Sequence, residues 1–294
     1  MKLSKRLLAA SIAALTVLSL SACGGQEETS SAAPSSQASQ EPASETAESS
    51  SAETITITVG ASPAPHAEIL ENIKPLLAKE GIELVIEEFT DYVIPNEALD
   101  AGDIDANYFQ HYPYLADFNA KNGTDMVAAA YIHFEPMGIY PGRTATLEEL
   151  QDGASIAVPN DPTNEARALL LLQKLGFITL KDGAGLDATP LDIVDNPHNI
   201  EFIEMEAVQL PTVLADVDFA VINGNYAVGA GIGGTMLDAE DKDSEAAQEF
   251  ANILAVRNGD ETRPEIQKLV EALQSEENAT FIEQKYEGSV IPVF

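Results

Sequence analysis

The sequence has very little cysteine and very little positive charge. Cys23 is the one cysteine among 294 residues, so disulfides play no part in stabilising the fold. Lys and Arg number 15 against 48 Asp and Glu, which gives a formal net charge of −33. A surface this acidic argues against binding of nucleic acid, phosphate-rich ligands and anionic lipid. Any anionic group that the protein binds must be met by one of a few local cations.

The common catalytic motifs are also missing. The chain has no Gly-x-Ser-x-Gly nucleophile elbow, no phosphate-binding Gly-x-x-x-x-Gly-Lys and no Gly-x-Gly-x-x-Gly directly after a predicted strand. Carboxylates are numerous, so composition alone leaves a hydrolytic pair open, but no pair is marked by its spacing. We therefore expect a protein that is not an enzyme and that needs no cofactor.

The N-terminus carries an export signal. Residues 1–6 include three basic residues and precede an apolar run at 7–20, which is too short to span a bilayer permanently. The following Leu-Ser-Ala-Cys resembles the bacterial lipobox, in which the cysteine is acylated and becomes the new N-terminus. An ordinary signal with a chance cysteine is the alternative. We predict a lipoprotein signal peptide at 1–22 and a lipid anchor on Cys23 at the extracytoplasmic face of the cell membrane.

A polar linker follows the predicted anchor. Residues 24–53 are mostly Ser, Ala, Gln, Glu, Thr and Pro, with no aromatic or long aliphatic side chain. Such a segment cannot bury enough apolar surface to offset the entropy of ordering, so 23–53 is predicted to be a lipid-anchored disordered linker. No later segment is apolar enough to cross a membrane.

Strands and helices alternate over the remaining residues, 54–294. Strands are expected at 55–59, 84–89, 126–134, 155–158 and 219–222. Helices are expected at 66–80, 97–101, 161–175, 208–214, 264–273 and 276–287, and loops at 107–114 and 223–226. Alternation of this kind predicts an α/β fold with parallel sheets and crossover helices, arranged as two lobes facing a cleft.

The segment 160–167 is the strongest candidate for a binding site. It follows a predicted strand and begins a helix, with Asp161 as N-cap and Pro162 in the first turn. Asn164 and Arg167 share one face of that helix. Free N–H groups, a favourable dipole and a guanidinium fork together form a carboxylate receptor. A surface arginine in a salt bridge is the alternative.

Two further groups of residues follow predicted strands. Tyr92, Phe109, His111 and Tyr114 can wall an apolar side-chain pocket, and sulfur packs well against ring edges. Core packing is the alternative. The amides of Asn223 and Asn225 can serve the α-amino and α-carboxylate groups of a zwitterion, although turn formation would also explain them.

A metal site is a competing hypothesis. His66, His111 and His133 fall at strand or loop ends, and Glu135 lies two residues after His133. Three imidazoles and a carboxylate would suit a transition metal captured outside the cell. The spacings are wide, and no two of these histidines share a helix. A surface adhesin or scaffold with a vestigial cleft would fit the N-terminal anchor equally well.

Several motifs together resemble the methionine-binding lipoprotein (NlpA-type) family. They are Val-Gly-Ala-Ser-Pro-Ala-Pro-His-Ala-Glu at 59–68, Phe-Thr-Asp-Tyr at 89–92, Asp-Ala-Asn-Tyr-Phe-Gln-His at 105–111, Pro-Asn-Asp-Pro-Thr-Asn at 159–164 and Ala-Val-Ile-Asn-Gly-Asn-Tyr-Ala at 220–227. The likeness runs through essentially all of 54–294. It implies a two-lobed periplasmic-binding-protein fold, type II-like with two crossovers, that supplies D- or L-methionine to the permease of an ABC importer.

The resemblance also implies an assignment of residues. Aromatic side chains would hold the thioether, while Asn164, Arg167 and Asn223 would hold the amino-acid ends. Lobe one would comprise 54–136 and 227–294, and lobe two 137–226, with hinges near 135–138 and 223–226; the protein is expected to be a monomer. Two departures, at 165–167 and in the glycine-rich stretch 229–243, are expected not to touch the ligand contacts.

Overall fold

The computed structural model describes residues 54–242 and 248–294, so the predicted signal peptide, the linker and Cys23 lie outside the described residues. The strands are β1 (Ile55–Ala61), β2 (Ile82–Glu88), β3 (Ala106–His111), β4 (Val127–Phe134), β5 (Gly138–Pro141), β6 (Ser155–Pro159), β7 (Thr179–Leu180), β8 (Ile193–Asp195), β9 (Glu201–Met205), β10 (Phe219–Ile222), β11 (Asp238–Ala239), β12 (Asn252–Val256) and β13 (Ile291–Pro292). The helices are α1 (Glu68–Lys79), α2 (Ile94–Ala101), α3 (Tyr112–Asn122), α4 (Pro162–Lys174), α5 (Gly224–Gly229), α7 (Pro264–Leu273) and α8 (Glu276–Tyr286).

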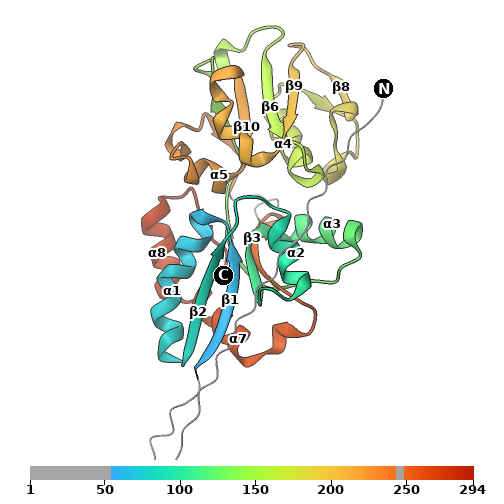
Figure 1. The fold of residues 1–294 in the computed structure, drawn as a ribbon. Helices are drawn as coiled ribbons and strands as arrows, with labels where there is room; N and C mark the ends of the chain where they lie inside the picture. The colour runs from blue at the N-terminus through green and yellow to red at the C-terminus, as the bar shows by residue number, and fades with distance from the viewer. Residues whose placement is uncertain (1–53, 243–247) are drawn as a thin grey trace, which may run out of the picture. The chain divides into compact units, whose positions relative to one another are not determined.

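Short helical turns complete the chain. They are η1 (Pro63–Ala67), η2 (Leu147–Glu149), η3 (Gly185–Asp187), η4 (Pro190–Asp192), η5 (Ala207–Thr212), η6 (Leu214–Asp216), η7 (Gly233–Thr235) and η8 (Asp260–Thr262). Two main sheets organise these elements, with strand orders β13-β4-β12-β3-β1-β2 and β11-β5-β10-β6-β9 (Figure 1). The described residues all fall within one compact unit.

The first sheet is covered by helices on both faces, with α1 and α8 on one side and α2 and α3 on the other (Figure 1). Alternate residues of a strand point to opposite faces, and β12 shows the consequence. Leu254 and Val256 join the apolar cluster of α1, α7 and α8, whereas Ile253 and Ala255 join that of α2 and α3. A strand buried on both faces reads as a continuous apolar run, which explains the composition of β12.

The second sheet follows the same rule. Ile156 and Val158 of β6 pack with α4, while Ala157 between them packs with η5 on the opposite face. Its strand β10 pairs in parallel with β6 and antiparallel with β5. Both sheets are mixed, which corrects the prediction of parallel sheets.

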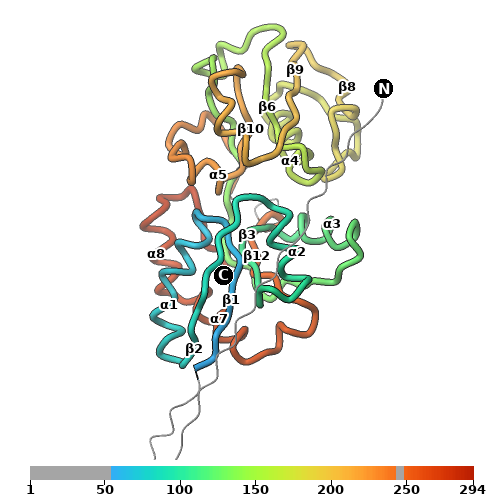
Figure 2. The backbone as a smooth tube through the Cα atoms, in the orientation of Figure 1, coloured from blue at the N-terminus to red at the C-terminus, as the bar shows by residue number. Residues whose placement is uncertain are grey.

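The antiparallel strands arise where the chain passes between the sheets. β4 of the first sheet leads to β5 of the second across residues 135–137, and β11 leads back to β12 across 240–251. Figure 2 shows β12, from the C-terminal part of the chain, beside β3. β11 pairs with β5 of the second sheet, so the chain returns to the first sheet only after β11, and the boundaries expected for the two lobes stay a prediction.

Two segments expected to be loops are regular structure. Residues 106–111 form the fully buried strand β3, and Asn223 is the N-cap of the short helix α5. The expected helix at 208–214 consists of 3-10 turns. The remaining predicted strands and helices are present, with ends shifted by a few residues.

Candidate functional site

The candidate site is built at the ends of buried strands. His111 ends β3, Glu135 follows β4, Asp161 follows β6 and Asn223 follows β10. Ligands of open α/β sheets gather at the carboxyl ends of strands, where side chains from neighbouring connections converge. Three of these residues are tied to α4, because Asp161 caps it and both His111 and Asn223 contact Asn164. Glu135 is held by His133 of β4.

These strand ends surround a small pocket. Its lining consists of Tyr92, Phe109, Gln110, His111, Tyr114, Glu135, Asn164, Arg167, Asn223, Gly224, Asn225 and Asn252. All eight residues predicted from the sequence to bind substrate are among them. The fold brings these eight side chains together around one pocket, and their role in binding stays a prediction.

Aromatic rings form one wall of the pocket. The centroid of Tyr92 lies 5.9 Å from that of Phe109 and 5.8 Å from that of Tyr114. Both hydroxyls are engaged, because Tyr92 donates to Oδ1 of Asn225 at 2.6 Å and Tyr114 donates to the carbonyl of Tyr92 at 2.9 Å. The polar tips are thereby satisfied, and the wall is suited to an apolar or sulfur-containing group.

A network of amides forms another part of the lining. Asp161 caps α4 by accepting from the backbone N–H of Asn164 at 3.1 Å, as predicted. The Oδ1 atom of Asn164 accepts from Nδ2 of Asn223 at 2.7 Å and lies 3.2 Å from Nε2 of His111. The Oδ1 atom of Asn223 is buried and has no partner among the described residues. A buried acceptor without a donor is costly, and an N–H group in the pocket could satisfy it.

Arg167 is buried and already paired with a carboxylate. Its Nε and Nη2 atoms donate to the two carboxylate oxygens of Glu240 at 2.6 and 2.5 Å, and Nη2 also donates to the carbonyl of Glu135 at 2.8 Å. Its guanidinium carbon lies 4.5 Å from the ring centroid of Phe250. Glu240 belongs to the stretch 229–243, so the expectation that this stretch leaves the predicted contacts untouched was wrong. Arg167 and Glu240 are 73 positions apart, and nothing in the sequence indicates that they form a pair.

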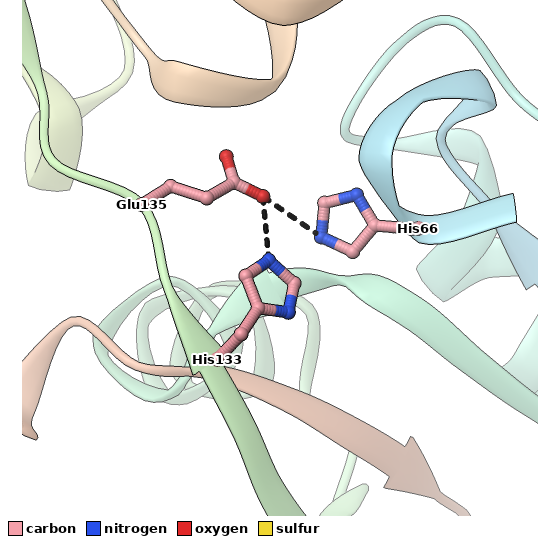
Figure 3. Close-up of side chains that lie close together, drawn as sticks. All are labelled: His66, His133 and Glu135. Atoms are coloured by element: carbon pink, nitrogen blue, oxygen red, sulfur yellow. Dashed lines mark hydrogen bonds and ion pairs between the residues drawn. The ribbon is translucent and has the colours of Figure 1, made fainter. Parts of the chain in front are cut away.

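A second cluster of titratable groups lies beside the pocket, with His66 and His133 pointing toward Glu135 (Figure 3). Nε2 of His133 is 2.6 Å from Oε1 of Glu135, and Nε2 of His66 is 3.5 Å from the same oxygen. All three are buried. Burial lowers the pKa of His133 to about 3 and that of His66 to about 4, and burial raises the pKa of Glu135.

Neutral imidazoles account for most of these contacts. With its proton on Nε2, His133 donates a hydrogen bond to Glu135, and its Nδ1 accepts one from the hydroxyl of Tyr108. With its proton on Nε2, His66 donates a hydrogen bond to Oδ1 of Asn252 at 3.0 Å. Nδ1 of His66 is buried without a partner among the described residues. The cluster is thus a hydrogen-bonded core that supports Glu135 at the edge of the pocket.

The metal hypothesis required four residues, and the structure brings three of them together. Ligand atoms of His66, His133 and Glu135 lie within 4.8 Å of one another. His111 is held elsewhere, between Asn164 and the backbone of Tyr114. Burial lowers the pKa of His111 to about 3, with a further contribution from the charge of Arg167. The comparisons below give no support to metal capture.

Sequence reasoning missed four residues of the lining or its support: Gln110, Asn252, Gly224 and Glu240. Gln110 was overlooked because its contacts with Asn96 and Asn107 appear only in the fold. Asn252 was overlooked because the strand that it begins was not identified. Gly224 approaches Glu135 so closely that a Cβ atom would lie 2.7 Å from the Cβ of Glu135. An Asn-Gly-Asn sequence after a strand was the available signal for that contact.

Two mixed sheets with a lined pocket at their strand ends match the fold of solved periplasmic substrate-binding proteins. The predicted fold is confirmed by solved structures of this class. Within it, the chain belongs to the NlpA lipoprotein family, whose model matches residues 57–294. In the part of the chain that the structure describes, no helix combines the length and the apolar character needed to cross a membrane.

Named relatives are similar over most of the chain. The D-methionine-binding lipoprotein MetQ of Escherichia coli O157:H7 is 43% identical over 217 residues, which are 72% of this chain and 79% of that protein. A nutrient-binding protein from Burkholderia cenocepacia, solved bound to methionine, is 44% identical with a TM-score of 0.77, over 81% of this chain and 100% of that one. An ABC transporter periplasmic substrate-binding protein from Coxiella burnetii is 40% identical with a TM-score of 0.76, over 81% and 100%.

Proposed function

We propose that this chain is the substrate-binding lipoprotein of an ABC importer, and that it captures methionine between its lobes and delivers it to the permease. The observation that carries the proposal is the pocket itself, in which an aromatic wall faces buried amides and an arginine. The names of the relatives point the same way. The role is binding and not catalysis, in keeping with those relatives.

The aromatic wall would hold the thioether of methionine. Tyr92, Phe109 and Tyr114 offer ring edges and faces at separations that leave an apolar surface toward the pocket. Sulfur–aromatic contacts contribute about 0.3–1.5 kcal/mol each. Norleucine, which has a methylene in place of sulfur, should therefore bind more weakly than methionine, and alanine more weakly still.

The amino-acid ends would meet the amides and Arg167. Oδ1 of Asn223 needs a donor, and an α-ammonium group supplies one. Nη1 of Arg167 has no hydrogen-bond partner among the described residues, and it can donate to the α-carboxylate. His111 and Asn225 would complete the site by holding Asn164 and Tyr92 in place.

Closure of two lobes would couple binding to delivery. The lobes are those of the two sheets, and closure would occur about residues 135–137, where the chain first passes from one sheet to the other. A ligand that contacts both lobes stabilises the closed form by its differential affinity for that form. The closed monomer would then dock on the permease.

A lipid on Cys23 would hold the protein at the outer face of the cell membrane. The lipobox-like sequence and the lipoprotein family support this part of the proposal. Labelled palmitate should enter the wild-type protein and not a Cys23→Ala variant. Equal labelling of both would refute the anchor.

Native mass spectrometry of the purified protein, before and after unfolding and refolding to remove ligand, tests the substrate. We expect release of methionine and its rebinding to the refolded protein. A different amino acid or a dipeptide would keep the class of protein and change the substrate. Bound metal, or no rebinding from an amino-acid panel, would contradict the proposal.

A further inference from the structure

The guanidinium of Arg167 is held on one edge by Glu240. The two carboxylate oxygens of Glu240 accept from Nε and Nη2 at 2.6 and 2.5 Å, as a bidentate pair. The side chains are 4% and 10% exposed, so both charges are largely withdrawn from water. Bidentate pairing of this kind fixes geometry as well as charge.

Glu240 is itself fixed to the crossover between the sheets. Its N–H donates to the carbonyl of Met137 at 3.0 Å, and its Oε2 accepts from the N–H of Met137 at 2.9 Å. The preceding strand β11 pairs with β5. The carboxylate is therefore tied through its backbone and its side chain, and it is not free to swing away when a ligand arrives.

This arrangement leaves one edge of Arg167 for a ligand. Nε and Nη2 are engaged by Glu240, and Nη2 also by the carbonyl of Glu135. Phe250 lies over the guanidinium at 4.5 Å. A ligand carboxylate can reach Nη1, but it then enters a site in which Glu240 already balances the positive charge and Glu135 adds a second carboxyl group to the lining.

We infer that Glu240 determines which charge type of ligand the pocket accepts. By positioning Arg167 and cancelling its charge, Glu240 makes the pocket select zwitterions, which bring an ammonium group with their carboxylate, over simple carboxylates. An anion without an ammonium group would leave a net negative charge in a buried site, which is costly. This inference rests on the proposed function, because it assumes an amino-acid ligand.

The test compares two ligands in three proteins. L-methionine and 4-(methylthio)butanoic acid share the thioether and the carboxylate, but the second lacks the α-amino group. Their dissociation constants are measured by calorimetry in the wild-type mature chain, in Glu240→Gln and in the control Asp238→Asn. Asp238 is exposed in the same segment and caps the N–H of Ala239, so its variant makes the same charge change away from Arg167.

Glu240→Gln should reduce the ratio of the two dissociation constants, and so the preference for methionine over the desamino acid, by about tenfold or more. Without the negative charge of Glu240, Arg167 attracts a carboxylate whether or not the ligand also carries an ammonium group. Asp238→Asn should keep the wild-type ratio. An unchanged ratio in Glu240→Gln would overturn the inference. This includes equal tightening of both ligands, which would mean that Glu240 merely competes with them. Wild-type protein that binds neither ligand would instead contradict the proposed function.

The wild-type protein provides a second test, which also serves if Glu240→Gln does not fold. Methioninamide keeps the ammonium group at pH 6.5 and lacks the carboxylate. With Arg167 balanced by Glu240, the desamino acid should lose more affinity than methioninamide does, relative to methionine. The opposite order would show that Arg167 acts as an unbalanced cation and would overturn the inference.

Discussion

Arg167 faces Glu240 on one edge and the pocket on the other, so its removal should affect both binding and folding. Arg167→Ala leaves the ligand carboxylate without its donor, and we expect methionine binding to weaken by about 2–4 kcal/mol, or roughly 30- to 700-fold. It also leaves the largely buried carboxylate of Glu240 without its counter-charge, which should destabilise the fold by about 3–5 kcal/mol. Calorimetry and urea unfolding measure the two effects.

Two further variants separate these effects. In Arg167→Ala combined with Glu240→Gln, the stranded charge is gone, so stability should partly recover while methionine affinity stays low. Arg143→Ala is the matched control, because Arg143 pairs with Asp218 at 2.9 Å with a side chain that is 54% exposed. Its affinity should stay within about twofold of wild type. Near-normal binding by Arg167→Ala would remove Arg167 from the site.

His111 predicts a specific dependence of stability on pH. Its pKa falls from 6.5 to about 3 because burial, and then the charge of Arg167, disfavour the imidazolium. Between these values the unfolded chain binds a proton at this site and the native protein does not, so the contribution of His111 to stability falls as pH falls below 6.5. By pH 5 the loss should be about 2 kcal/mol.

His111→Asn isolates this contribution. Nδ1 of His111 accepts from the N–H of Tyr114 at the start of α3, and asparagine is also a good N-cap. Urea unfolding of both proteins from pH 8 to pH 5 should give a stability difference that is constant above pH 6.5. Below that pH it should move by about 2 kcal/mol in favour of the variant. A difference that does not change with pH would refute a neutral, buried His111.

The start of α5 depends on the absence of a side chain at Gly224. A Cβ on Gly224 would lie 2.7 Å from the Cβ of Glu135 and 3.1 Å from its Oε2, closer than ordinary contact. Gly224→Ala should push α5 away from the first crossover, lower stability by about 1–3 kcal/mol and weaken methionine binding. Thermal unfolding and calorimetry of the variant measure both.

Gly229→Ala is the control within the same helix. A Cβ at Gly229 meets no atom within 4 Å, and the position has no positive φ. This variant should bind methionine normally and be as stable as wild type, or more stable by about 0.4–1 kcal/mol, because alanine narrows the unfolded ensemble. Equal losses in both variants would point to a general intolerance of α5 and not to the contact with Glu135.

The sequence predicted elements with a clear period and missed those without one. β1 alternates and α4 carries its capping residues, so both were placed correctly. β3 is buried along its whole length, and its polar residues find partners outside the strand: Gln110 and Asn107 bond Asn96 in α2. A polar and aromatic segment without alternation looks like a loop, because its hydrogen bonds are not visible in the pattern.

The same limit applies to the candidate site. Its aromatic and amide residues were predicted because they follow strands and match family motifs. Glu240 could not be predicted, since its partner is far along the chain and its own surroundings are rich in glycine and acid. Asn252 could not be predicted for a related reason. It forms a hydrogen bond with His66, and the two residues are brought together only by the order of the strands in the sheet.

At the scale of the molecule, the pocket links the two sheets. Phe109 and His111 come from the first sheet, whereas Asn164 and Arg167 lie on α4, which packs on the second. His111 meets Asn164, and Tyr226 donates to the carbonyl of Thr90 at 3.0 Å. Bonds of this kind couple the stability of one sheet to that of the other.

Methionine should therefore stabilise both sheets together. At a concentration of about one hundred times Kd, a ligand that binds only the native state adds about 2.7 kcal/mol, which corresponds to about 5–11 °C in Tm for a chain of this size. Differential scanning calorimetry of the ligand-free protein should show one transition that moves as a whole on adding methionine. Because the ligand would touch side chains carried by both sheets, neither sheet can unfold without releasing it. Two transitions of which one alone responds to methionine would instead place the ligand on a single lobe and remove the basis for lobe closure.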